Sequence, residues 1–212
     1  MTPNIIKEKL LIVEGKDEVN VFTKLLNHLE IDTIQIFDIG GKDRFKKELI
    51  FLKDVPGFDT VTALGVIRDA DNDANIAFQS VAGTLKCCGL TPPDKHNTFS
   101  NNIPSELSPK TCVFIISRDD NQGMLEDLCL ASVENKPAMK CVIALCECIS
   151  ELWIYERIAA PKNIAKAKTQ AYLACMPDIA GSIGVGAEKS YWNLDNRAFD
   201  KLKSFIRTLK EI

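Results

Sequence analysis

The sequence lacks several features that would define a function class at once. No apolar run approaches the about 18–20 residues that a membrane helix needs, and nothing at the N-terminus resembles a signal peptide. We therefore expect a cytoplasmic protein without a membrane association. Only two histidines occur in 212 residues, and the eight cysteines include no Cys-x-x-Cys pair, so a structural zinc site is not expected.

The overall composition is that of an ordinary globular protein. Hydrophobic residues make up 46% and charged residues 26% of the chain, enough for one large domain or a domain with an appended subdomain. The net charge of −3 argues against bulk binding of nucleic acid, but residues 162–210 hold nine Lys or Arg against four Asp or Glu. These basic residues either grip a phosphate backbone or simply decorate exposed helices.

Three carboxylates follow the apolar run Val61–Ile67 at alternate positions, as Asp69, Asp71 and Asp73. If the run is a strand, they emerge beyond its carboxyl end, where α/β folds place their ligands. Carboxylates gathered so closely repel one another unless a hard cation such as Mg²⁺ lies among them. The alternative is a solvated loop that ends in a helix cap, a position that Asp also favours.

Other apolar runs end in a similar way. The run Lys9–Val13 stops at Glu14-Gly15, and Thr33–Ile39 stops at Gly40-Gly41-Lys42. A glycine between a strand and an amphipathic helix is typical of a turn that approaches phosphate. A further strand, Cys112–Ser117, is followed by Asp119 and Asp120, which are either metal ligands or helix caps.

Strand and helix patterns alternate along the first part of the chain, which predicts an α/β fold with a parallel sheet. A Rossmann-like order of 2-1-3-4 would make the first and third strands neighbours and bring Glu14, Asp69 and Asp71 together. We expect an α/β domain at residues 1–135, with residues 89–111 forming a long loop or hairpin excursion. Residues 136–212 are expected to form a helical C-terminal extension packed on it.

This succession of strand ends, Glu-Gly, then Gly-Gly-Lys, then Asp-x-Asp, resembles the Toprim domain. That metal-binding module is shared by topoisomerases, bacterial primases and the overcoming-lysogenization-defect nucleases. The resemblance implies that Asp69 and Asp71 bind Mg²⁺, that Glu14 binds metal or moves a proton, and that Asp73 stands where a third acid often occurs. Segments further on resemble a family of small, stand-alone bacterial Toprim-related proteins of unassigned function.

The candidate site therefore combines acids that hold metal with groups that bind phosphate. One or two ions, Mg²⁺ or Mn²⁺, would suit a set of up to six carboxylates. Glu126 and Asp127 fall in the first turn of a helix, where the helix dipole favours acids whatever their function. Arg68 is a further residue that could contact phosphate. The predicted metal ligands are Glu14, Asp69, Asp71, Asp73, Asp119 and Asp120, and the predicted phosphate-binding residues are Lys16, Gly40, Gly41, Lys42, Lys166 and Lys168.

The favoured function is Mg²⁺-dependent hydrolysis of phosphodiesters in DNA or RNA, with Glu14, Asp69 and Asp71 as catalytic residues. Tyr155, Tyr172 and Tyr191 all fall in the expected helical layer, which disfavours topoisomerase chemistry, and the regions that a primase needs are lacking. Overcoming-lysogenization-defect enzymes carry or associate with an ABC-type ATPase. This chain has no Walker motif, so a separately encoded ATPase is an expected partner. The alternative is a non-catalytic Toprim module that binds nucleic acid or regulates a partner ATPase.

Overall fold

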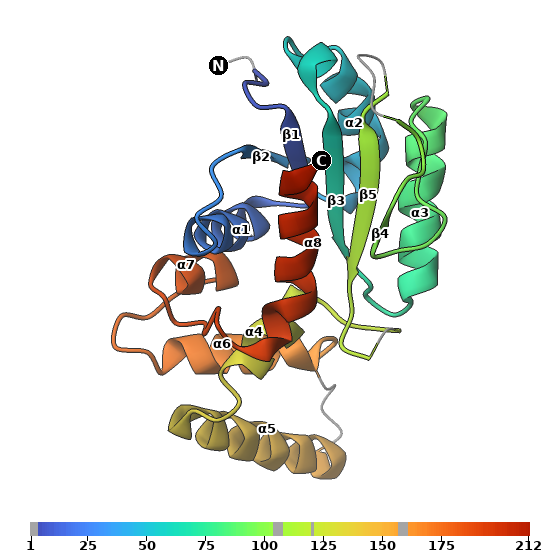
Figure 1. Ribbon diagram of the computed structural model, residues 1–212. Helices are drawn as coiled ribbons and strands as arrows, with labels where there is room; N and C mark the ends of the chain where they lie inside the picture. Colours follow the sequence, from blue (N-terminus) through green and yellow to red (C-terminus); the bar gives the residue numbers. More distant parts are fainter. Residues whose placement is uncertain (1–3, 104–107, 120, 157–160) are drawn as a thin grey trace.

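A five-stranded sheet forms the centre of the protein. The computed structural model describes residues 4–103, 108–119, 121–156 and 161–212 (Figure 1). The strand order is β2-β1-β3-β5-β4, with β1, β2, β3 and β5 parallel and β4 antiparallel to β5. The strands are β1 (Lys9–Val13), β2 (Ile34–Asp38), β3 (Ala63–Asp69), β4 (Thr98–Phe99) and β5 (Lys110–Ile116).

This topology confirms the predicted α/β class and the predicted order, with β5 as the fourth parallel strand. The short strand β4 comes from the predicted excursion at residues 89–111 and adds an antiparallel edge. Because the strands are parallel, the carboxyl ends of β1, β3 and β5 lie at the same edge of the sheet. Residues far apart in sequence, after Val13, Asp69 and Ile116, therefore emerge close together.

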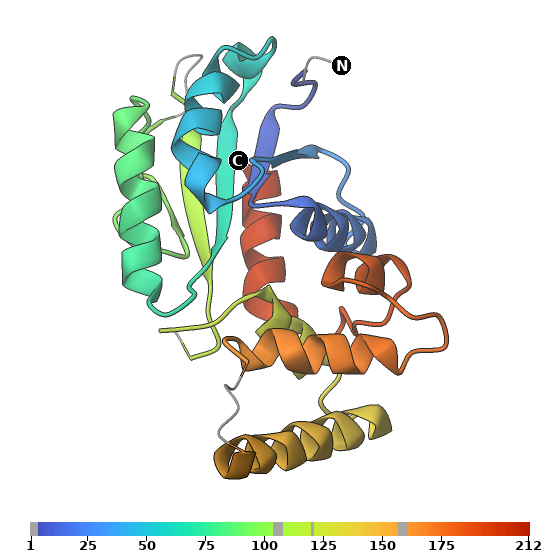
Figure 2. The same ribbon diagram turned by 180° about the vertical axis from the view of Figure 1, so that it is seen from behind.

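The sheet is buried on both faces, as its apolar strand sequences require. Leu11 and Val13 of β1 point into one core layer, while Leu10 and Ile12 point into the other. Helices α2 (Phe45–Lys53) and α3 (Ala74–Cys87) cover the second face (Figure 2). Helices α1 (Lys16–His28) and α8 (Asp200–Glu211) cover the first.

The C-terminal helix α8 belongs to the core of the α/β fold. It crosses the sheet so closely that a Cβ on Gly65 of β3 would lie 2.9 Å from a methyl group of Leu209. Phe205 of α8 packs against Phe99 of the edge strand β4 and Phe114 of its neighbour β5. Residues from both sides of the predicted boundary at 135/136 thus share one core. The division into two domains stays a prediction.

Four helices lie around the carboxyl edge of the sheet or beyond it, and short 3₁₀ turns complete the fold. Helix α7 packs on α1, α6 packs on α4, and α5 lies outermost along α6 (Figure 1). No helix among the described residues is long and apolar enough to cross a membrane. The remaining elements are α4 (Leu125–Ser132), α5 (Pro137–Glu156), α6 (Ile164–Ala174), α7 (Ile183–Glu188), η1 (Lys42–Arg44), η2 (Phe58–Thr60) and η3 (Arg197–Phe199).

Helix α7 fixes the beginning of α1, next to the end of β1. The Asp17 carboxylate, in the first turn of α1, accepts hydrogen bonds from the Ser182 hydroxyl and from the backbone N–H of Gly184. A Cβ on Gly184 would lie 2.6 Å from that carboxylate, so a glycine is needed for the close approach. The first turn of α1 is therefore held in place from outside the sheet.

Candidate functional site

Four acidic residues converge where β1 and β3 end and where α1 and α4 begin. Glu14 follows β1, and Glu18 lies in the first turn of α1. Asp69 is the last residue of β3, and Glu126 lies in the first turn of α4. We call these four residues the acid cluster, because Asp69 interacts electrostatically with each of the other three.

Asp69 lies at the centre of the acid cluster. One of its carboxylate oxygens accepts a hydrogen bond of 3.0 Å from the backbone N–H of Leu125, the first residue of α4. Burial raises the pKa of Asp69 well above its ordinary value, and the charges of Glu126, Glu14 and Glu18 raise it further. The hydrogen bond to Leu125 only partly offsets these effects. A cation placed beside Asp69 would relieve both the burial and the repulsion.

Glu126 and Glu18 are also disfavoured as anions in this position. Burial raises the pKa of Glu126, while Lys166 lowers it from a distance of 3.8 Å between its Nζ and a carboxylate oxygen. Burial likewise raises the pKa of Glu18, with Glu14 and Asp17 adding repulsion. Both residues lie at helix N-termini, whose dipoles favour anions, so the raised pKa values show how strongly the carboxylates are desolvated and crowded.

Glu14 is held by a cation from the neighbouring strand. The Nε of Arg68, in β3, lies 3.1 Å from a carboxylate oxygen of Glu14, and both side chains are largely buried. This ion pair crosses from one strand end to the next. It makes Arg68 a part of the site, next to Asp69 in sequence.

The chemistry of the acid cluster fits a hard divalent cation, but its side chains are not arranged as a ligand set. Mg²⁺ and Mn²⁺ prefer carboxylate oxygens, and the cluster offers four carboxylates in a desolvated setting. Among the described residues, no group of three or more His, Cys, Asp or Glu side chains is positioned to hold a metal ion. Binding would require side-chain rotation, with Glu14 turning away from Arg68.

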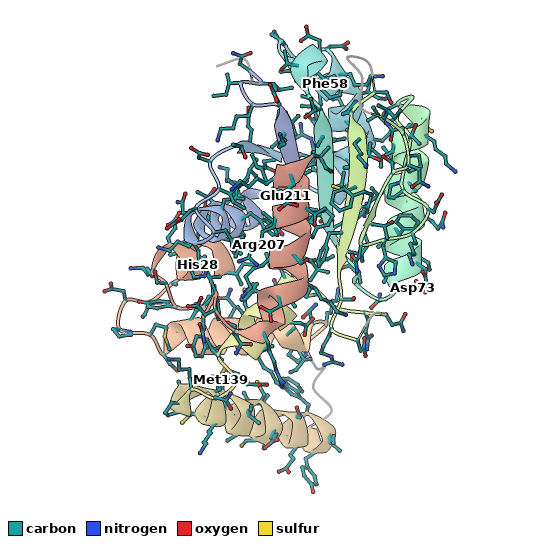
Figure 3. The ribbon with its side chains drawn as sticks, viewed as in Figure 1. His28, Phe58, Asp73, Met139, Arg207 and Glu211 are labelled. Carbon is teal, nitrogen blue, oxygen red and sulfur yellow. The ribbon has the colours of Figure 1, made fainter. Side chains whose placement is uncertain are left out.

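Asp71 and Asp73 lie outside the acid cluster. Asp71 is exposed, with a positive φ of 51°, and its backbone forms an isolated antiparallel bridge with Gly123. Asp73 caps α3, since its carboxylate accepts hydrogen bonds from the N–H groups of Asn75 and Ile76. Figure 3 shows Asp73 at the end of that helix. The capping alternative therefore describes Asp73, while the metal-binding roles of both residues stay predictions.

The acids after β5 are less informative. Asp119 is exposed, and its carboxylate accepts a hydrogen bond of 3.3 Å from the N–H of Gln122, which stabilises the loop. Asp120 lies outside the described residues. A metal-binding role for either residue stays a prediction.

A cleft of about 540 Å³ opens beside this edge of the sheet, between the loops after β3 and β5 and the start of α6. Asp71 lines one side and Asn163, the N-cap of α6, lines the other. Two cations, Arg118 and Lys162, line the cleft together with two acids, Asp71 and Asp127, and with amides, a glycine and apolar side chains. The cations and the amides can contact the oxygens of a phosphate ester.

The predicted phosphate-binding residues fall into two groups. Gly40 and Gly41 have positive φ values, and the N–H of Gly41 donates to the carbonyl of Glu14, so this turn buttresses the end of β1. Lys16 is exposed at the start of α1, and the side chain of Lys42 lies outside the described residues. On α6, Lys166 pairs with Glu126, whereas Lys168 is half-buried. Among the described side chains of these residues, that of Lys166 is the one paired with a carboxylate of the acid cluster.

Sequence reasoning missed two members of the acid cluster. Glu18 lies one helical turn after Glu14, and this spacing could have identified it as a second acid on the same side of the turn. From the sequence alone, the helix dipole is sufficient to explain an acid at Glu126. It lies in the first turn of α4, and only the packing of α4 against β3 brings it to Asp69. No local pattern in the sequence around Glu126 predicts that it lies close to Asp69.

Comparison with known proteins identifies the family. Residues 8–211 match the family described as "Protein of unknown function (DUF3226)". The chain belongs to this family. The match spans the whole DUF3226 fold described above, from β1 to the last turn of α8.

This DUF3226 protein was also compared with curated proteins and with solved structures. No curated protein matches its sequence. Among solved structures, the chain is similar to the C-terminal region of the OLD protein of Xanthomonas campestris pv. campestris. The identity is 10%, the TM-score is 0.41, and the similarity covers 95% of this chain and 97% of that one.

Proposed function

We propose that this protein is a Toprim-type, Mg²⁺-dependent hydrolase of phosphodiester bonds in nucleic acid. The observation that carries the proposal is the convergence of Glu14, Glu18, Asp69 and Glu126 at the carboxyl edge of a parallel sheet. Burying four carboxylates together costs stability unless a ligand compensates for it, so such a group points to function. A divalent cation bound there would stabilise the charge that develops on a phosphate oxygen.

Different residues would bind the ion, bind the phosphates and accept a proton. The acid cluster would hold the ion, and Lys166, next to Glu126, would contact the phosphate at the point of cleavage. Arg118 and Lys162 would bind the adjacent phosphate in the cleft. A water molecule would attack phosphorus, the bond to the leaving oxygen would break, and a carboxylate of the cluster would accept the proton of the water.

Water is the favoured nucleophile because two of the three tyrosines have other partners and the third lies on the outermost helix. Tyr172 is buried and stacks on Trp192, with ring centroids 5.5 Å apart. The hydroxyl of Tyr191 donates to the carbonyl of Asp178, and Tyr155 is exposed on α5. None of the three is among the groups that shift the pKa of Asp69. Cleavage through a covalent tyrosine intermediate is therefore not favoured.

A non-catalytic Toprim module is the second candidate, and the ion pair of Glu14 with Arg68 favours it. Arg68 forms an ion pair with Glu14, the acid to which the Toprim resemblance assigns metal binding or proton transfer. The described side chains also form no ready ligand set. In this alternative, the cleft and the lysines of α6 would bind nucleic acid, and Arg68 would permanently compensate for part of the acid cluster.

The test is cleavage of plasmid, linear duplex, single-stranded DNA and RNA in the presence of Mg²⁺ or Mn²⁺. It is run with the protein alone and with an ABC-type ATPase encoded beside it, the partner that the proposal expects. We expect metal-dependent cleavage that Asp69→Asn abolishes. Asn can still accept the hydrogen bond from Leu125, so this variant should keep the fold and bind nucleic acid.

Lysine variants test the proposed contacts with nucleic acid. Replacing Lys166 and Lys168 by Ala should weaken the binding of nucleic acid and reduce its dependence on salt concentration, because fewer phosphates are neutralised. Lys162→Ala should act in the same way through the cleft. If every substrate stays intact under all of these conditions, the hydrolase proposal is rejected and the non-catalytic binding module remains as the candidate function.

A further inference from the structure

Helix α5 carries many large apolar side chains that are exposed and do not pack in the core. It holds five of the twelve large hydrophobic side chains that are exposed among the described residues. The helix is 20 residues long, about 30 Å, and packs on α6 along one side only. In Figure 1 it lies at the outer limit of the molecule, away from the sheet.

Two separate apolar seams run along α5, each with the alternating spacing of three and four residues that lets one helix pack along another. The inner seam faces the protein, with Met139 (labelled in Figure 3) and Val142 buried. The outer seam lies next to it, about 100° around the helix axis, and its members are exposed except for the half-buried Ala138. The inner seam consists of Met139, Val142, Cys146, Ile149 and Trp153, and the outer seam of Ala138, Cys141, Leu145, Cys148, Leu152 and Tyr155.

We propose that the outer seam of α5 is a dimer interface that pairs with the α5 of a second copy in antiparallel orientation. The order of side chains along the seam is what selects a second copy. Small residues dominate its first half and large ones its second half. An antiparallel copy therefore sets a large residue opposite a small one in every layer, with the pairs Tyr155–Ala138, Leu152–Cys141 and Leu145–Cys148, each formed twice.

A parallel pair would not pack in this way. Each residue would then face its own copy, so Tyr155 would meet Tyr155 at one end and Ala138 would meet Ala138 at the other. The two helices would be forced apart at one end and leave gaps at the other. The antiparallel order gives layers of similar total volume, which the close packing of interiors requires.

Charge also favours the antiparallel pair. Lys140 lies near the N-terminal end of α5 and Glu147 and Glu151 lie in its C-terminal half, on one flank of the outer seam. This is the reverse of what the dipole of a single helix prefers. In the antiparallel pair, Glu151 of each copy comes within about one turn of Lys140 of the other and approaches its helix N-terminus. The gain comes from Glu151 and Lys140, because in this register Glu147 comes level with Glu147 of the other copy.

The size of the contact sets its expected strength. A strip about 30 Å long and roughly 10 Å wide covers about 300 Å² on each copy, below the about 800 Å² per partner of a standard specific interface, so the dimer should be weak. We expect a dimer that dissociates in the micromolar range, measurable by sedimentation of the full chain under reducing conditions. Leu145→Glu and Leu152→Glu should each raise the dissociation constant by at least about 100-fold, because two-fold symmetry places each charge in the interface twice.

The matched control is Ile154→Glu on the same helix. Ile154 is more exposed, at 78%, than Leu145 at 49% or Leu152 at 48%, but it lies off the outer seam. Dimerisation through the seam predicts that Ile154→Glu leaves the dissociation constant unchanged, whereas nonspecific apolar association predicts its largest loss there. Circular dichroism should show the same helix content in all three variants.

A thiol crosslink tests the orientation. With Leu152→Cys, a short crosslinker should join the new sulfur to Cys141 of the other copy, as peptide mapping would show. Within one chain these positions lie about 16 Å apart, beyond its reach. A crosslink from position 152 to its own copy would contradict the antiparallel register. A wild-type chain that is monomeric into the high micromolar range, or a dimer insensitive to both Leu→Glu changes, would overturn the proposal and leave the seam to a different protein.

Discussion

Two sets of acids leave the same edge of the sheet, and their surroundings differ. Asp73 and Asp119 sit at the surface, where backbone N–H groups stabilise their negative charge. Asp69, Glu18 and Glu126 are crowded and desolvated, and the pKa of each is raised. Asp73 and Asp119 stabilise local structure, while the acid cluster costs stability. A buried acid whose charge is poorly compensated is the better candidate for function.

Cleavage assays offer the largest expected effect. Glu126→Gln and Glu18→Gln should each lower metal-dependent cleavage by at least about 100-fold, since each removes a charge from the group proposed to hold the ion. Asp119→Asn keeps an acceptor for Gln122 and should change the rate by less than a few fold. A large loss with Asp119→Asn and none with Glu126→Gln would contradict the role of the acid cluster and would support Asp119 as a metal ligand, as the sequence predicts.

Thermal unfolding with and without Mg²⁺ gives the next effect in size. At about 100 times its dissociation constant, a cation bound only by the folded state stabilises it by about 2.7 kcal/mol. For a chain of this length, that corresponds to roughly 5–10 °C in Tm. Asp69→Asn should remove most of the gain, and Asp73→Ala should keep it. An equal shift in both variants would place the ion outside the acid cluster.

The pH dependence of stability without metal should be smaller and should have a definite sign. The folded pKa values of Asp69, Glu18 and Glu126 are raised, so the folded state binds more protons than the unfolded state just above the ordinary carboxyl range. Stability should therefore fall as pH rises through that range toward neutrality. Asp69→Asn should flatten this fall, as denaturant titrations at several pH values would show. A steeper fall in the variant would contradict the burial of Asp69 as an unfavourable anion.

The helix cap gives the smallest expected effect. Asp73→Ala removes the acceptor for two N–H groups of α3 and should cost about 1 kcal/mol, equivalent to about 2–4 °C in Tm. Asp73→Asn should recover most of that loss, because an amide oxygen can also cap. If both changes also abolish the response to Mg²⁺, Asp73 is a ligand as well as a cap.

Much of the fold was predictable from local patterns. Apolar runs of five to seven residues alternating with amphipathic helices identified β1, β3, β5 and their parallel order. Glycine turns identified where β1 and β2 end. The two-residue strand β4 carries too short a pattern to be recognised, although an excursion was expected there. The role of α8 as a cover of the sheet depends on tertiary packing that periodicity does not encode.

The candidate site was only partly predictable for a related reason. Asp69 and Glu14 follow strands, and the strand order fixes where they meet. Glu126 and Lys166 come from α4 and α6, and their approach depends on how these helices pack. The spacing of Asp69, Asp71 and Asp73 also could not show that Asp71 adopts a left-handed conformation or that Asp73 caps α3. The sequence indicates which acids leave the sheet, whereas the packing decides which of them stay together.

Direct titration of the apo protein with Mn²⁺, followed by electron paramagnetic resonance of the free ion, tests the central claim most directly. We expect saturable binding by the wild type that competes with Mg²⁺, is lost with Asp69→Asn and weakened with Glu126→Gln, and is retained with Asp73→Asn. Arg68→Gln, which frees Glu14 from its ion pair, should tighten binding. Binding that is absent from the wild type, or equally strong in Asp69→Asn, would contradict a metal site in the acid cluster.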